Sequence, residues 1–121
     1  MRIIKLAVAA GIAGMMVVAS SAQAQTPPKK EETGKDIAFK RSKGNCLACH
    51  GMPTQPDAAS TGLYGPPLIA MSARFPDKAK LRAKIWDATA SNPNTSMPPF
   101  GKHKVMTEQE IDKVTDFIHS I

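Results

Sequence analysis

The pentapeptide Cys46-Leu47-Ala48-Cys49-His50 constrains this chain more than any other segment, and it holds both cysteines of the sequence. Its C-x-x-C-H spacing is typical of c-type haem attachment. Two thiols three residues apart on one turn can add to the two vinyl groups on one edge of a haem, and the next residue then presents an imidazole to the iron. We therefore predict one covalently attached haem c, bound through Cys46 and Cys49, with His50 as an axial ligand of the iron.

Three other interpretations of this cysteine pair are weaker. A structural zinc site needs four ligands, commonly from two separated pairs, and the sequence has no second cysteine pair. A thioredoxin-like redox pair belongs in a β-α-β pattern, and no strand-rich stretch surrounds this one. A disulfide across two intervening residues would close a small, strained loop and stabilise the chain little. Neither the redox pair nor the disulfide gives His50 a role.

The N-terminal segment is typical of an export signal. Arg2 and Lys5 precede an apolar run over residues 6–18, and residues 22–24 (Ala-Gln-Ala) form a cleavage site of small residues. The run is shorter than the roughly 20 residues of a membrane-spanning helix, although an uncleaved anchor is the alternative. We predict a cleaved signal peptide over residues 1–24, a flexible tether over 25–33 and a cytochrome c domain over 34–121. The mature protein is expected in the bacterial periplasm, without a membrane span.

The charge of the chain favours a protein partner over nucleic acid. The formal net charge is +6, and removing the two cations Arg2 and Lys5 leaves +4. No basic stripe is interleaved with aromatic residues, so nucleic-acid binding is not expected. A basic cluster just before the haem motif comprises Lys35, Lys40, Arg41 and Lys43. We interpret it first as a solvated helix face and second as a docking patch for an acidic partner.

Capping residues and helical periodicity predict helices and no confident strand. The helices are expected over residues 35–43, 68–73, 76–90 and 107–120, with loops over 51–67 and 91–106. Thr33 can cap the first helix, and Thr107 with Glu110 forms a capping box for the last. The last helix buries residues at helical spacing, namely Ile111, Val114, Ile118 and Ile121. We predict an all-α, class I cytochrome c-like fold of three to four helices around one covalently attached haem.

A six-coordinate haem iron needs a second axial ligand. The candidates are Met52, Met71, Met97, Met106, His103 and His119. Met97 lies in a loop and is followed by prolines that stiffen the backbone, which suits a sulfur held in a fixed place. We predict Met97 as the second ligand and keep His103, in the same loop, as the rival; ligation by His103 would lower the reduction potential. Met71 and Met106 are expected to pack in the core.

Five segments follow one another over nearly the whole predicted domain: GNCLACH at residues 44–50, GPPL at 65–68, RFPD at 74–77, NPNTSMPPFGKH at 92–103 and TEQEID at 107–112. Together they resemble SoxX, the small monohaem cytochrome c subunit of the bacterial thiosulfate-oxidising Sox system. The motif around Met97 is much more specific than C-x-x-C-H, which alone indicates only a cytochrome c. One departure is Leu63-Tyr64, where the family would have Asn-Ile or similar.

The resemblance implies that catalysis and electron transfer are carried out by different subunits. SoxX-like proteins pair with SoxA, a larger subunit that carries the catalytic, cysteine-ligated haem, in the SoxAX heterodimer. That complex oxidatively joins thiosulfate to a cysteine of the carrier SoxY, an L-cysteine S-thiosulfotransferase reaction. By this resemblance the chain takes up the released electrons and passes them to a downstream cytochrome c. No catalytic residue is expected in this chain, because both of its thiols are committed to the haem.

Other functions remain open at this point. A free-standing soluble cytochrome c electron shuttle would carry the same haem motif without a stable partner. A haem sensor or ligand-binding module would require a labile distal ligand. A disulfide-bonded binding protein would contain no haem at all.

Overall fold

The computed structural model describes residues 30–58 and 61–121, which form helices and loops with no strand. The α-helices are α1 (Gly34–Phe39), α2 (Met71–Arg74), α3 (Lys78–Trp86) and α4 (Glu108–His119), and the short 3₁₀ helices are η1 (Cys46–Ala48) and η2 (Ala88–Ala90). The predicted all-α plan is confirmed. The predicted signal peptide over residues 1–24 and residues 25–29 of the predicted tether lie outside the described residues.

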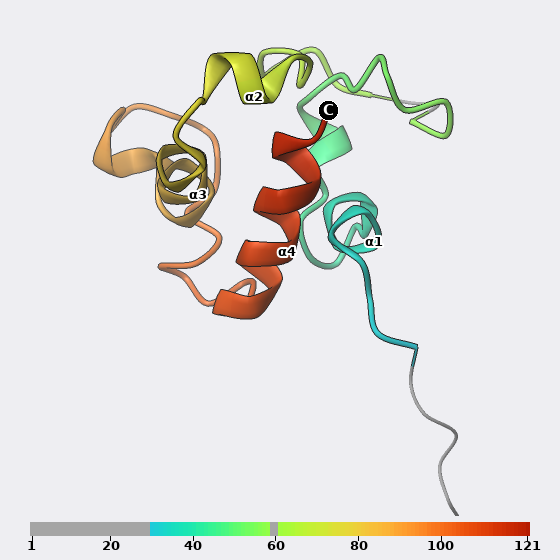
Figure 1. Cartoon of the computed structure of the whole chain (residues 1–121). Coiled ribbons are helices and arrows are strands. Elements are labelled where there is room, and N and C mark those ends of the chain that lie inside the picture. The colour runs from blue at the N-terminus through green and yellow to red at the C-terminus, as the bar shows by residue number, and fades with distance from the viewer. Residues whose placement is uncertain (1–29, 59–60) are drawn as a thin grey trace, which may run out of the picture.

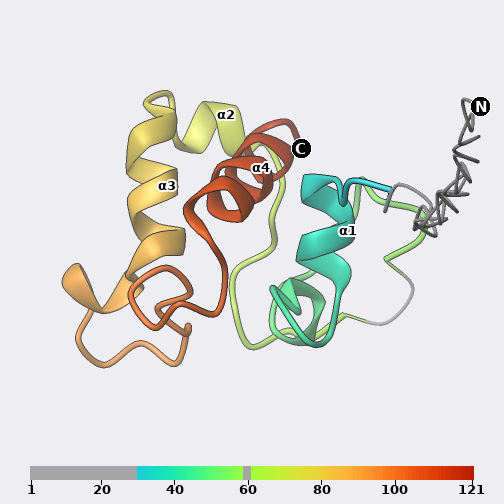
Figure 2. The same cartoon turned by 90° about the horizontal axis from the view of Figure 1, so that it is seen from below.

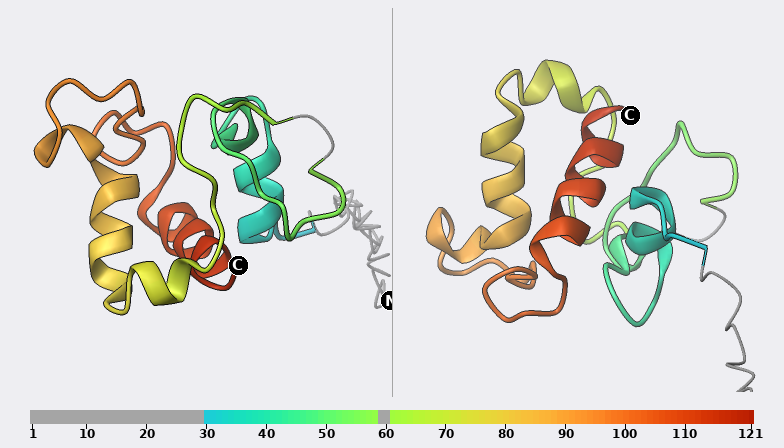
Figure 3. Two further views of the ribbon diagram at one scale, coloured as in Figure 1. Left: turned by 90° about the horizontal axis from the view of Figure 1, so that it is seen from above. Right: turned by 60° about the horizontal axis from the view of Figure 1, so that its bottom comes forward.

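Helix α4 is the centre of the fold, with α1 on one side and α3 on the other (Figure 1). Helix α2 lies near the C-terminal end of α4, where the amide of Met71 donates to the carbonyl of Ile121 at 2.7 Å. The views from below (Figure 2) and from above (Figure 3) show the same order of helices. Within the described ranges, no helix has the length and apolar character needed to cross a bilayer.

The contact between α1 and α4 is close because a glycine lies at the crossing. A Cβ atom on Gly34 would lie only 2.0 Å from the carbonyl oxygen of Lys113 in α4. The rings of Phe39 and Phe117 meet edge to face beside this crossing, with centroids 6.1 Å apart. Edge-to-face aromatic pairs add stability beyond the apolar area that they bury. The crossing therefore ties the segment before the haem motif to the last helix.

Helix caps follow the predicted residues, although α1, α2 and α3 are all shorter than predicted. The Thr33 side chain accepts from the amide of Asp36, and the Asp36 side chain accepts in return, as in a capping box. Helix α1 nevertheless ends at Phe39, since Lys40 is extended and the amide of Gly44 donates to the carbonyl of Ile37 at 3.1 Å. The chain thus turns four residues earlier than predicted. The predicted helix over 76–90 is divided into α3 and η2.

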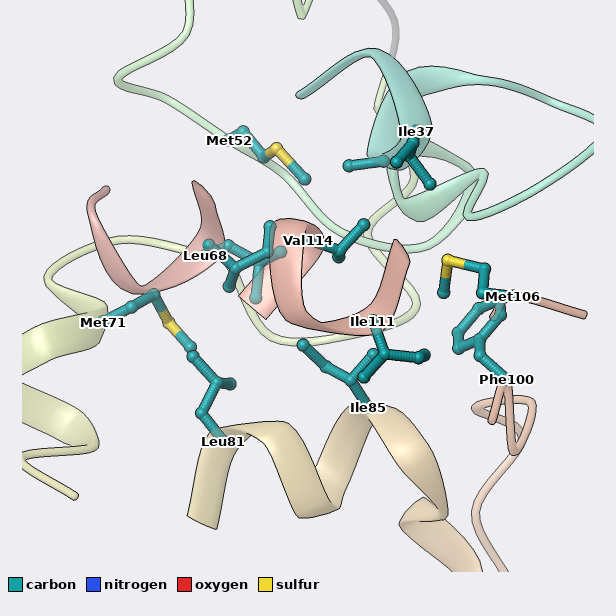
Figure 4. Packing of buried hydrophobic residues seen from close by; sticks show 12 residues of the cluster. Ile37, Met52, Leu68, Met71, Leu81, Ile85, Phe100, Met106, Ile111 and Val114 are labelled. Carbon is teal, nitrogen blue, oxygen red and sulfur yellow. The ribbon is translucent and has the colours of Figure 1, made fainter. Parts of the chain in front are cut away.

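The core is built around α4 (Figure 4). Its predicted buried face is confirmed for Ile111, Val114 and Ile118, and Ile121 packs partly buried against the same cluster. The capping box of Thr107 and Glu110 is also present. Side chains from the other elements complete the cluster, including Ile37, Met52, Leu68, Met71, Leu81, Ile85, Phe100 and Met106. Met71 and Met106 are both buried, as predicted.

Most of the predicted basic cluster is neutralised within the chain. Lys35 pairs with Asp57 at 2.7 Å, Lys40 pairs with Glu32, and Lys43 pairs with Glu110. Among the four cations of the cluster, only Arg41 has no ion pair within the described part of the chain. The cluster is not a helix face, because only Lys35 lies in α1, and three of its four charges are paired within the chain. The Lys43–Glu110 pair also joins the turn before the haem motif to the first turn of α4.

The Lys43–Glu110 pair predicts a pH dependence of stability. The hydrogen bond from Lys43, with help from the Thr107 amide, lowers the pKa of Glu110 below its ordinary value of 4.5. A carboxylate with a lowered folded-state pKa stabilises the fold above its unfolded pKa, and this contribution is lost as the pH falls through the folded pKa. We expect Lys43→Gln to lower the free energy of unfolding by up to about 1 kcal/mol near pH 7.

Denaturant unfolding of the purified protein near pH 7 and in acid measures this effect. The difference between wild type and Lys43→Gln should shrink in acid, where Glu110 is protonated in both proteins. Lys80→Gln is the matched control, since Lys80 is exposed and forms no ion pair within the described part of the chain. A difference that stays constant over this pH range would contradict the assignment.

Candidate haem site

A cavity of about 580 Å³ opens between the haem motif, α2, α3, α4 and the loop over residues 91–106. Its volume lies in the range of roughly 300–1,000 Å³ that is usual for cofactor sites. Buried apolar side chains form much of its wall, namely Leu68, Met71, Leu81, Ile85, Phe100, Met106, Val114 and Ile118. A cavity lined in this way suits a large, flat, apolar group.

The haem motif forms a tight turn at the edge of this cavity. Asn45 starts the turn in the left-handed conformation, with φ of 46°, which asparagine tolerates better than most residues. Helix η1 follows, and the amide of His50 donates to the carbonyl of Cys46 at 2.9 Å. This turn places Cys46, Cys49 and His50 together on the cavity wall.

The two thiols are free, and that of Cys46 is poorly suited to disulfide exchange. Burial raises the pKa of the Cys46 thiol to about 11, although the residue as a whole keeps part of its surface accessible. Redox-active thiols of C-x-x-C pairs instead have lowered pKa values, since the thiolate is the nucleophile. In the described part of the chain, no three His, Cys, Asp or Glu side chains are grouped as a metal site. The cysteine pair therefore has the surroundings of neither a thioredoxin motif nor a zinc site.

The ring of His50 is fixed by a hydrogen bond and by a close backbone contact. Its Nδ1 lies 2.6 Å from the carbonyl oxygen of Pro66, and because a carbonyl can only accept, Nδ1 carries the proton. With the proton on Nδ1, Nε2 is the ring nitrogen left to bind a metal, the arrangement that metal-binding histidines usually have. Gly65 packs on the ring, where a Cβ atom would lie 2.5 Å from Cε1.

Met97 lines the same cavity, whereas His103, the alternative ligand, does not. The amide of Met97 donates to Thr95 Oγ1 at 3.2 Å, which fixes the backbone just before the thioether. His103 is exposed and is not part of the cavity wall. His119 also lies off the cavity, with Nε2 3.0 Å from the carbonyl of Phe75. Met52 is buried in the core away from the wall, and Met71 and Met106 are both core and wall residues.

The donor set of the cavity fits a c-type haem. Cys46 and Cys49 could hold it by thioether bonds, while His50 and Met97 could ligate its iron. The observation that supports this fit most directly is the proton held on His50 Nδ1 by Pro66, since it prepares the other ring nitrogen for a metal.

Some parts of the site could not be identified from motif spacing. Residues 65–67 were interpreted only as loop breakers and as part of the resemblance, yet Gly65 and the Pro66 carbonyl position His50. Arg74 is a further cavity residue, and its guanidinium donates to the carbonyl of Pro67 at 2.7 Å. The Gly-Pro-Pro sequence at residues 65–67 could have indicated this contact, because a glycine lets the backbone lie close against another group.

The fold and the cavity define a c-type cytochrome domain. Residues 30–118 match the family model described as cytochrome c oxidase, cbb3-type, subunit III, and the chain belongs to this family. Membership in this cytochrome family implies a haem c cofactor and a role in electron transfer.

Two known proteins resemble the chain more specifically. The crystal structure of SoxXA from P. pantotrophus aligns with a TM-score of 0.65 and 26% identity over 72% of this chain and 77% of that chain. An uncharacterised lipoprotein of Aquifex aeolicus (strain VF5) is 30% identical over 77 residues, or 64% of this chain. The chain matches only 36% of that relative's length. The predicted resemblance to SoxX and the predicted class I cytochrome c fold are confirmed.

The contact between Gly65 and His50 predicts the effect of a single methyl group. In Gly65→Ala, the new Cβ atom would overlap the imidazole, so we expect the ring to move and the bond to Pro66 to be lost. Steric insertions of this kind typically destabilise a protein by about 1–3 kcal/mol. Thermal unfolding and the visible spectrum of the haem-loaded variant measure the change.

Gly51→Ala is the matched control, because its Cβ atom would find only Thr61 Oγ1 at an ordinary 3.7 Å. It lies next to His50 in sequence but not against the ring. Equal, small effects of both substitutions would show that the Gly65 contact does not position the histidine.

Proposed function

We propose that this chain is the electron-transfer cytochrome subunit of a periplasmic SoxAX-type complex. The observation that carries the proposal is one cavity lined by Cys46, Cys49, His50 and Met97 in a chain with the fold of a SoxXA structure. The match at 26% identity over most of both chains favours a Sox protein over an unrelated cytochrome. The proposed signal peptide would bring the chain to the periplasm, where its two thiols are consumed as thioethers.

We assign the residues of the cavity as follows. Cys46 and Cys49 would hold the haem covalently, and His50 and Met97 would ligate its iron. When bound, the haem supplies reversible uptake of one electron. The Pro66 carbonyl keeps the proton on His50 Nδ1, and the buried side chains of Phe100 and Met106 limit the access of water. With His50 and Met97 both bound to the iron, the chain would offer no coordination site for a substrate.

The proposed partner is a larger, SoxA-like haem subunit that carries out the chemistry. Thiosulfate is joined there to the cysteine of a SoxY-type carrier; a sulfur–sulfur bond forms, the thiol proton is lost and two electrons are released. This chain would accept those electrons one at a time and pass each to a downstream cytochrome c. With Cys46 and Cys49 both committed as thioethers, this chain would offer no free thiol for the reaction, which supports placing catalysis in the partner.

Co-purification tests the proposed function. The tagged mature chain is isolated from the periplasm of its own organism grown on thiosulfate, and proteins bound to it are identified by mass. We expect a stoichiometric larger haem protein, and a complex that joins thiosulfate to the carrier protein. A red, reducible monomer without a partner would instead support the free-standing soluble cytochrome c shuttle.

The assignment of Met97 predicts a specific ligation defect. We expect Met97→Ala to keep the haem covalently attached but to open the sixth coordination position, so that carbon monoxide binds readily to the reduced protein. His103→Ala is the matched control from the same loop and should keep the ligation of the wild type. If Met97→Ala has an unchanged spectrum and His103→Ala loses ligation, His103 is the ligand.

A further inference from the structure

One hydrogen bond connects the two loops that carry the proposed axial ligands. The hydroxyl oxygens of Tyr64 and Ser96 lie 3.2 Å apart, and both residues line the cavity. Tyr64 directly precedes Gly65, which packs on the His50 ring. Ser96 directly precedes Met97. The bond therefore joins the histidine side of the site to the methionine side.

The loop over residues 61–68, which contains Tyr64, is held to the haem motif by backbone hydrogen bonds. The amides of Gly62, Gly65 and Leu68 donate to carbonyls of residues 47, 49 and 51, at 2.7, 2.8 and 2.8 Å. Two of these bonds flank Tyr64 at residues 62 and 65, so its backbone is fixed. The side chain itself is 78% exposed, as is neighbouring Leu63 at 92%. Packing in the core consequently does not hold the Tyr64 ring, which leaves the hydroxyl contact to do so.

The loop that carries Met97 is held differently. Residues 93–98 make hydrogen bonds within their own loop, such as Thr95 to Asn92 and Met97 to Thr95. Their backbone groups make no hydrogen bond to another segment of the described chain. Among the hydrogen bonds of residues 30–58 and 61–121, the Tyr64–Ser96 bond alone connects this segment to the loop over 61–68. The segment before Met97 thus depends on a side-chain bond for its position.

We propose that Tyr64 and Ser96 are positioning residues that hold the Met97 loop closed. The proposal rests on the ligand assignment of the proposed function, since it concerns the ease with which Met97 leaves the iron. Opening of the loop must break the bond between the two hydroxyls, so the bond lowers the population of the open form. A ligand that competes with Met97 can bind only to the open form, and its apparent affinity scales with that population.

Imidazole binding to the oxidised, haem-loaded protein tests the proposal, with the visible spectrum as the readout. Tyr64→Phe keeps the ring and removes the hydroxyl. We expect the affinity for imidazole to rise about threefold to tenfold, the range that the loss of one hydrogen bond produces. Ser96→Ala should produce the same increase, and Ser96→Thr, which keeps a hydroxyl, should restore the behaviour of the wild type.

The double variant separates a direct bond from two unrelated effects. Because both single substitutions break the same bond, Tyr64→Phe combined with Ser96→Ala should have no larger effect than either alone. Leu63→Ala is the matched control, as it removes an equally exposed side chain without touching the bond, and it should bind imidazole like the wild type. Fully additive single effects, or unchanged affinity in Tyr64→Phe, would overturn the proposal.

The same spectra distinguish failure of this proposal from failure of the proposed function. A wild-type protein with the charge-transfer band of methionine ligation, together with unchanged variants, refutes only the role of Tyr64 and Ser96. A wild-type protein without that band refutes Met97 as a ligand, and the positioning role is then refuted with it.

Discussion

The site depends on the backbone register between the haem motif and residues 62–68. Three amides of this segment donate to alternate carbonyls of residues 47–51. Because the register is fixed, Gly65 lies against the His50 ring and the Pro66 carbonyl meets Nδ1. A shift by one residue would replace Gly65 with Tyr64 or Pro66 at the ring, and neither leaves room for it. The orientation of one imidazole thus follows from hydrogen bonds that involve no side chain.

The helices give this register a rigid support. Helix α1 leads directly into the turn that precedes Cys46, and it is anchored on α4 through Gly34 and the Phe39–Phe117 contact. Helix α4 also provides Val114 and Ile118 to the cavity wall. The same helix therefore holds the attachment motif from behind and closes the cavity from the side. Helix α4 has a capping box and buries four residues at helical spacing, which suits it to both roles.

Local signals in the sequence predicted the helices and the haem motif well, because capping boxes and helical spacing act over a few residues. Thr33, Thr107 and the buried face of α4 are found as predicted. The end of α1 was predicted wrongly, since it is set by the turn over residues 40–44 and not by helix propensity. The partners of His50 and Ser96 lie 16 and 32 residues away along the chain. Contacts at that separation depend on how loops meet in space, which periodicity and motif spacing do not report.

The two sides of the cavity are built by different means, and this difference bears on function. His50 is held by backbone groups and a glycine contact, so few substitutions could alter its position without disturbing the fold. On the other side, the Met97 amide donates to Thr95 Oγ1 and, by our proposal, the bond between the exposed residues Tyr64 and Ser96 holds the loop. Residues 63–64 lie on the exposed loop that meets Ser96. By our proposal, substitutions at Tyr64 or Ser96 would change how firmly the Met97 loop is held, while the haem motif and the helices stay unchanged.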